Sequence, residues 1–259
     1  MCKLKSAIIL KDRIFMPDYD NHSKMLEELK ITDDYINASK VFVRAELVPE
    51  NGDAFSDIDG WKLEVDQDIT PEWFDEKDCA ERMRKAVKEW AKTHIFIGQN
   101  ELKISHGENI FIKDCKNVDI CDSATVERIC GGAAVERICG DAAVKNICDD
   151  ATVKNIYDDA TVKNIYGSAT VKNICDDATV KNIYGDATVE YICDNATVKN
   201  VYGNAMVKNV CDNATVISSP YIKWSNSASL IIADNATFKD CYSKTIYQAG
   251  RWKFVEVKK

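Results

Sequence analysis

The sequence contains few prolines and histidines and no long apolar run. Its 259 residues include 4 prolines and 3 histidines, and no two histidines have metal-ligand spacing. No apolar stretch approaches the roughly 20 residues that cross a bilayer. The N-terminal apolar run, Ala7 to Leu10, is followed at once by Lys11, Asp12 and Arg13. A secretory signal needs a longer apolar segment, so we expect a cytoplasmic protein.

An excess of positive charge is also missing, since the formal net charge is −8 and the pI is about 5.1. Nucleic acids and anionic membranes are bound by basic surfaces, so we expect direct binding to neither. No glycine-rich phosphate loop occurs, and the carboxylates of Asp66, Asp68, Asp75 and Glu76 lie near a predicted helix start, where they serve the helix dipole. The sequence therefore predicts neither catalytic residues nor a cofactor.

Cysteine, by contrast, is abundant. This chain has eleven cysteines. In a small secreted protein, so many cysteines would indicate a disulfide framework. Here most of them occupy one position of a short repeat, where cysteine alternates with tyrosine. A residue that exchanges with tyrosine is not half of an obligatory disulfide. We therefore predict reduced thiols.

The central part of the chain is a tandem repeat of nine residues, from about residue 120 to 216. The unit reads Ala-Thr-Val-Lys-Asn-Ile-Tyr/Cys-Gly/Asp-Asp/Asn. Its β-branched residues and its closing Gly, Asp or Asn pair favour short strands joined by turns. The repeated alanines are Ala124, Ala133, Ala142, Ala151, Ala160, Ala169, Ala178, Ala187, Ala196, Ala205 and Ala214.

A second period of eighteen residues underlies the first. From Tyr166 onward, tyrosine and cysteine alternate between successive units, and Gly and Asp alternate at the next position. Units eighteen residues apart therefore match. This pattern predicts a parallel β-solenoid whose 18-residue coil contains two repeats, with equivalent residues stacked about 4.8 Å apart.

Strand alternation predicts which side chains face the core. Ala and Val of each unit point inward, and Thr and Lys point outward. Ile follows Val by three residues, so a bend near Lys-Asn must reset the alternation. Ile then points inward, and Tyr or Cys points outward. The core consists of narrow rows of Ala, Val and Ile, and one unit cannot fold without its neighbours.

The flanks indicate further parts. Residues 1–100 predict a small α+β domain with a hairpin at 6–16, a short helix near Met25, and strands at 40–48 and 61–69. A longer helix is predicted to begin at Thr70-Pro71, with Thr70 as its N-cap. Residues 101–247 form the solenoid, which starts with degenerate coils. Residues 248–259 predict a C-terminal capping strand, and Pro220, Tyr221 and Trp224 are further cap candidates.

The repeat resembles two known kinds of short-repeat solenoid, in general architecture only. Its period of nine with acidic turns resembles RTX β-rolls, a resemblance that implies calcium binding. However, the RTX pattern needs several glycines, and only Gly131-Gly132 matches it. We therefore interpret the acidic pairs as turn residues that tolerate the left-handed conformation. Pentapeptide-repeat proteins are similar in being acidic solenoids, some of which imitate DNA.

A thiol metal site is the next alternative. Cys175, Cys193 and Cys211 are predicted to form one outward file with the strand spacing. Zinc prefers four ligands in a tetrahedron, which a straight file supplies poorly. We therefore predict no metal site.

The remaining candidate is a file of lysines beside a file of tyrosines. Tyrosine is enriched at protein interfaces, where it gives a large contact area at low entropic cost. Stacked tyrosines can equally serve only to stabilise the rod, and the sequence leaves both interpretations open. The predicted binding residues are Lys163, Lys181, Lys199, Tyr166, Tyr184 and Tyr202.

We thus expect a non-enzymatic solenoid that binds or scaffolds a protein partner along one face. Near-identical units indicate recent tandem duplication, which is common in phage and mobile-element genes and favours an inhibitor or decoy role. Two alternatives remain: an N-terminal enzyme domain that uses the solenoid as a rigid spacer, or an acidic DNA mimic.

Overall fold

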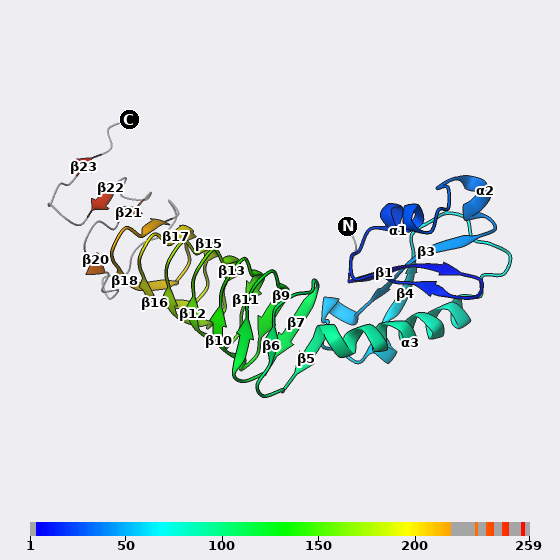
Figure 1. The fold of residues 1–259 in the computed structure, drawn as a ribbon, viewed down its shortest axis with the longest axis horizontal. Coiled ribbons are helices and arrows are strands. Elements are labelled where there is room, and N and C mark those ends of the chain that lie inside the picture. Colours follow the sequence, from blue (N-terminus) through cyan, green and yellow to red (C-terminus); the bar gives the residue numbers. More distant parts are fainter. Residues whose placement is uncertain (1–3, 219–230, 233–236, 241–244, 249–254, 257–259) are drawn as a thin grey trace. The chain divides into compact units, whose positions relative to one another are not determined.

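The computed structural model describes residues 4–218, 231–232, 237–240, 245–248 and 255–256. The chain divides into two compact units, Met1–Ile95 and Phe96–Lys259, and each is described by itself. The first is a small α+β unit, and the second is a parallel β-solenoid (Figure 1). This confirms the predicted fold class.

The N-terminal unit is built on a four-stranded antiparallel sheet with the order β2-β1-β3-β4. Strand β1 (Lys5–Leu10) forms the expected hairpin with β2 (Ile14–Phe15), and β3 (Phe42–Val48) lies between β1 and β4 (Lys62–Val65). The short elements between the strands are α1 (His22–Glu28), α2 (Tyr35–Ala38), and the 3-10 turns η1 (Glu50–Gly52) and η2 (Ile58–Gly60).

Both faces of this sheet are covered. On one face Ile8 and Phe42 pack with Met25 and Leu26 of α1. On the other face Ile9 and Val43 join the cluster that contains Cys79 of helix α3 (Glu76–His94). The strand predicted at 40–48 is present as β3, and it buries the consecutive residues Phe42 and Val43. The reason is that α1 and α3 cover opposite sides of the same strand.

The predicted start of the long helix was wrong. Thr70 and Pro71 precede the helix, and Asp75 is its N-cap, with a side-chain oxygen that accepts a hydrogen bond from the backbone N–H of Asp78. A carboxylate at the N-cap satisfies an orphan N–H and also interacts favourably with the helix dipole. The buried face of α3 consists of Cys79, Ala80, Met83, Val87, Trp90 and His94.

The solenoid consists of two parallel sheets on opposite sides of its core. Its first strands are β5 (Ile95–Ile97), β6 (Lys103–Ile104), β7 (Ile110–Lys113) and β8 (Val118–Ile120), so that the strands begin slightly before the expected residue 101. The 11-stranded sheet then takes the odd-numbered strands β9 (Thr125–Cys130), β11 (Ala143–Ile147), β13 (Thr161–Ile165), β15 (Thr179–Ile183), β17 (Thr197–Val201) and β19 (Thr215–Ser218). The 8-stranded sheet takes the even-numbered strands β10 (Ala134–Ile138), β12 (Thr152–Ile156), β14 (Thr170–Ile174), β16 (Thr188–Ile192) and β18 (Met206–Val210).

Strand pairing confirms the coil of eighteen residues. In the 11-stranded sheet Thr161 pairs with Thr179, and Thr179 pairs with Thr197. Consecutive nine-residue units therefore lie in different sheets, whereas alternate units stack in register. The Ala, Val and Ile positions form one continuous buried core from residue 104 to 216.

The predicted reset of the strand alternation is present within each unit. Val162 and Ile165 are both buried, although they are three residues apart. Lys163 between them is exposed, and Asn164 is half-buried. The strand thus keeps its apolar residues inside by turning at Lys-Asn.

The asparagine at this bend forms a ladder that the sequence analysis missed. The side-chain amide of Asn182 donates to Oδ1 of Asn164 at 2.9 Å, and that of Asn200 donates to Oδ1 of Asn182 at 3.1 Å. Asn164 donates in the same way to Asn146 at 3.0 Å. These bonds satisfy half-buried amides and hold successive coils in one register.

At the C-terminal end the strand pairing changes from parallel to antiparallel. Strand β20 (Ile231–Ile232) pairs in parallel with β18, and β21 (Thr237–Asp240) pairs in parallel with β19. Strands β22 (Thr245–Gln248) and β23 (Val255–Glu256) then pair antiparallel at the edge of the 11-stranded sheet. The cap candidates Pro220, Tyr221 and Trp224 lie outside the described residues.

The asparagine ladder generates a stability prediction. Asn182→Ala removes one donor and one acceptor from the middle of the ladder, and we expect it to lower the free energy of unfolding by about 1–3 kcal/mol. Urea unfolding measures this change. Lys181→Ala, at the exposed neighbouring position, is the control and should change stability by less than about 0.5 kcal/mol. Equal effects of the two substitutions would show that the ladder does not stabilise the rod.

Candidate functional site

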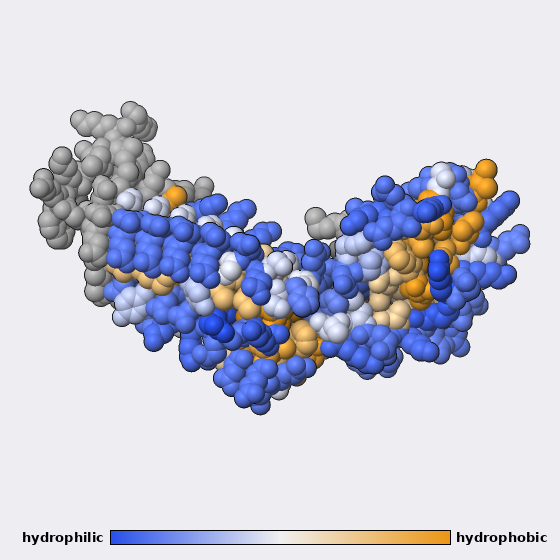
Figure 2. All heavy atoms as spheres, viewed as in Figure 1, coloured by the Kyte–Doolittle hydropathy of each residue, from blue (hydrophilic) through white to orange (hydrophobic). Residues whose placement is uncertain are grey.

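The predicted lysines form a file on the outer side of the 11-stranded sheet. Lys163, Lys181 and Lys199 are exposed on β13, β15 and β17. Because these strands pair in register, the lysines repeat at the strand spacing of about 4.8 Å. Figure 2 shows hydrophilic side chains in regular rows along the visible side of the solenoid.

These three lysines lack the carboxylate partner that Lys145, Lys154 and Lys208 of the solenoid have. Lys145 forms an ion pair with Glu127 at 2.7 Å, and Lys208 forms one with Glu190 at 3.3 Å. In each pair the glutamate lies one coil earlier. Within the described residues, Lys163, Lys181 and Lys199 form no ion pair. Their stacking partners are lysines, so the file is an array of uncompensated positive charge.

The predicted tyrosines form a stack immediately after the same strands. The ring centroids of Tyr166 and Tyr184 are 5.0 Å apart, with an interplanar angle of 4°. Those of Tyr184 and Tyr202 are 4.9 Å apart, at 5°. All three side chains are half-buried. Because each ring covers its neighbour's face, the stack presents mainly ring edges and hydroxyl groups to solvent.

The hydroxyls of Tyr166 and Tyr184 are held in their neutral form. Burial, followed by a hydrogen bond with Cys148, raises the pKa of Tyr166 to about 12. Burial also raises the pKa of Tyr184. A neutral phenol donates a hydrogen bond, and the edge of an aromatic ring is electropositive. The tyrosines and lysines therefore share one chemical preference, for anionic or acceptor-rich groups. We call these six residues the Lys–Tyr strip.

The two kinds of turn explain why glycine accompanies tyrosine. Gly185 has a φ of +71°, and a Cβ at this position would lie 3.1 Å from the backbone nitrogen of Gly167. These turns stack backbone against backbone. In the opposite turns, the Asp194 carboxylate accepts the N–H of Asp176, and the Asp212 carboxylate accepts the N–H of Asp194. The predicted left-handed turn residues are thus confirmed, and these aspartates serve the turns.

The cysteines of both sheets are less exposed than predicted. Cys175 and Cys193 are half-buried, while Cys130, Cys139 and Cys148 are 4%, 8% and 3% exposed. The expected outward direction is therefore wrong for the last three. A thiol is short and stays close to the strand end, where longer side chains of the adjoining coil cover it. The nine described cysteines form no disulfide.

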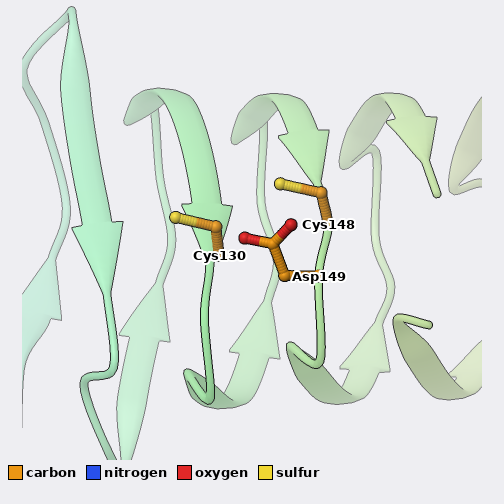
Figure 3. Close-up of side chains that lie close together, drawn as sticks. All are labelled: Cys130, Cys148 and Asp149. Carbon is orange, nitrogen blue, oxygen red and sulfur yellow. The ribbon is translucent and has the colours of Figure 1, made fainter. Parts of the chain in front are cut away.

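Two clusters combine cysteine thiols with an aspartate. In one, Cys130, Cys148 and Asp149 place three potential ligand atoms within 4.8 Å of one another (Figure 3). In the other, Cys193 belongs to overlapping groups with Cys175 and Asp194 and with Cys211 and Asp212. The sequence prediction of no metal site was based on the cysteines alone. Asp149, which directly follows Cys148, is the residue that could have indicated a site with both thiol and carboxylate ligands.

The thiols of the first cluster are electrostatically coupled. The hydrogen bond from Cys130 lowers the pKa of Cys148 to about 7, against the opposing effect of burial. The same interaction raises the pKa of Cys130. The positive charge of Arg128 lowers both values. One thiolate is therefore accessible near neutral pH, whereas removal of the second proton needs another cation.

The N-terminal unit contains a pocket of about 580 Å³ that is open to solvent. Asp34, Asp66, Asp68 and the ion pair between Arg44 and Asp33 contribute to its lining. Among the described residues, those that line the pocket include no His, Cys, Ser or Lys. The lining thus offers four carboxylates, the Arg44 guanidinium, the Tyr35 phenol and the Gln67 amide.

Comparisons with protein-family models, with curated proteins and with solved structures found no match. In the part of the chain that the structure describes, no helix is long and apolar enough to span a membrane. The site is therefore interpreted from its own geometry.

The tyrosine stack generates a second stability prediction. Tyr184→Ala removes two ring contacts, each worth about 0.5–1.5 kcal/mol beyond area burial. Tyr202→Ala removes one of these contacts, so we expect about half the stacking loss in urea unfolding. Tyr191→Ala is the control, because Tyr191 is 44% exposed and its loss should cost less than about 0.5 kcal/mol. If all three variants unfold alike, stacking does not stabilise the rod.

Proposed function

We propose that this protein is a non-enzymatic binding or scaffold protein whose solenoid recognises an acidic protein surface through the Lys–Tyr strip. The observation that carries the proposal is the absence of ion pairs at Lys163, Lys181 and Lys199 within the described residues, in the file that begins with the paired Lys145. Like charges stacked at the strand spacing repel one another. Carboxylates of a partner relieve that repulsion.

The tyrosines complement the lysines. Their stack fixes the three hydroxyls in one row, so little side-chain entropy is lost when a partner binds. Both halves of the strip are hydrogen-bond donors, and both repeat once per coil. A partner whose acidic groups recur at a similar spacing gains several contacts from a single alignment. The strip thus favours an acidic protein over a basic or purely apolar one.

The two alternative functions receive less support. An acidic DNA mimic needs carboxylates that are free to take the place of phosphates, whereas Asp176, Asp194 and Asp212, although exposed, each use one carboxylate oxygen to accept a backbone N–H. An enzyme in the N-terminal unit needs a nucleophile, a base and a group that orients it. The pocket supplies aspartates, Arg44 and Tyr35, and its Asp66 lies 3.2 Å from the His22 imidazole, but these groups do not recur along the fold as the strip residues do. A binding role uses the residues that the fold arranges most regularly.

The proposal includes a cellular setting. Reduced thiols along the coils suit the reducing cytoplasm, where we place the protein. Near-identical coils suit a young, duplicated gene of a phage or mobile element. In that setting, an inhibitor or decoy that covers an acidic surface of its target is the form of binding that we favour.

Quantitative capture from a lysate of the source organism tests the strip. Changing Lys163, Lys181 and Lys199 together to glutamine removes three charge-assisted contacts of about 0.5–1 kcal/mol each, so partner recovery should fall about tenfold or more. Changing Tyr166, Tyr184 and Tyr202 to phenylalanine keeps the rings and should give an intermediate loss.

The matched control changes Lys154, Lys172 and Lys208, on the opposite sheet, to glutamine and should leave capture unchanged. Rising salt should release the partner, because exposed charges are screened. A partner that is captured equally by the strip variant and by the wild type would contradict the proposal.

A further inference from the structure

We propose that Cys130, Cys148 and Asp149 form a binding site for a thiophilic divalent metal ion of the zinc class. The site supplies two sulfur ligands and one carboxylate oxygen, and leaves a fourth position for water. Zinc is commonly held by three protein ligands and one exchangeable ligand. The site adjoins the Lys–Tyr strip, because Cys148 hydrogen-bonds with Tyr166, but it is argued from its own ligand geometry.

The coil geometry brings the three ligands together. Cys130 ends β9 and Cys148 follows β11, and these strands pair with Ile147 opposite Ile129. The two cysteines therefore occupy equivalent places in adjacent coils. Asp149 has a φ of +58°, and this left-handed turn directs its carboxylate back toward the earlier coil. Figure 3 shows the carboxylate lying beside both thiols.

The distances fit one bound ion. The three ligand atoms lie within 4.8 Å of one another. Two sulfurs that are each about 2.3 Å from a tetrahedral ion lie roughly 3.8 Å apart. Small side-chain rotations close that difference. The earlier objection that a straight file of thiols lacks tetrahedral geometry does not apply, because the carboxylate comes from the turn and lies outside the file.

The surroundings orient the ligands. Oδ2 of Asp149 accepts a hydrogen bond from the N–H of Gly131 at 3.2 Å, which leaves Oδ1 available. Outer contacts of this kind hold metal ligands in place. Both thiols are buried, while Asp149 is exposed, so an ion enters from the carboxylate side. The nearby charge of Arg128 also favours thiolates.

The chemistry selects a soft ion. Two thiolates disfavour Ca²⁺ and Mg²⁺, which prefer oxygen ligands. Binding releases both thiol protons to the solvent, and the thiolates with the Asp149 carboxylate then carry three negative charges around a divalent ion. The cluster at Cys175 and Cys193 is less enclosed, because both thiols there are half-buried, whereas Cys130 and Cys148 are buried.

Titration of the full-length, reduced protein with Co²⁺ and Cd²⁺ tests the site. We expect a sulfur-to-metal charge-transfer band that saturates at one equivalent of tightly bound ion. Zn²⁺ should displace Co²⁺ and remove its visible spectrum. Cys130→Ser combined with Cys148→Ser should abolish the tight band, whereas Cys175→Ser combined with Cys193→Ser should leave it unchanged.

Asp149→Asn keeps the proposal testable if the cysteine variants fold poorly. Asparagine tolerates the left-handed conformation and still accepts the hydrogen bond from Gly131. We expect metal affinity to fall about tenfold or more, with an unchanged thermal melt of the metal-free protein. No charge-transfer band in the wild type, or an unaltered band in the Cys130/Cys148 double variant, would overturn the proposal.

Discussion

In-register stacking of parallel strands eighteen residues apart is the constraint on which the rest of the solenoid depends. It places every side chain above its own equivalent. Alanine, valine and isoleucine therefore form continuous apolar rows, and asparagine forms a ladder of amide hydrogen bonds. In-register stacking also brings together side chains that repel each other, so lysine lies beside lysine. The charged file is a consequence of the coil that the core requires.

Most of the solenoid could be predicted because the sequence contains two regular patterns, one for the repeat unit and one for the coil. The nine-residue spacing of alanine gives the unit, and the alternation of tyrosine and cysteine gives the coil. Burial of Val162 and Ile165 follows from requiring both apolar positions to face inward. The lysine and tyrosine files also follow directly, since equivalent residues must stack. What these files bind is not recorded in a period.

The errors arose where local competition or a neighbouring coil decides the outcome. Thr70 and Asp75 are both good N-cap residues, and sequence alone does not show which one the helix uses. The burial of Cys130 and Cys148 depends on what covers the thiols from the next coil, as the contact of Tyr166 with Cys148 illustrates. The mixed thiol–carboxylate cluster was missed because the left-handed turn at Asp149 redirects a side chain that strand alternation sends elsewhere.

Two units per coil have one more consequence, for how such a protein changes over generations. Insertion or loss of eighteen residues within the repeat keeps every remaining file aligned and leaves both ends of the rod as they are. Insertion of a Tyr-type and a Cys-type unit together adds one lysine and one tyrosine to the Lys–Tyr strip. Under the binding role proposed above, contacts then grow in number while their geometry is preserved, so gene length alone tunes avidity for a repetitive partner.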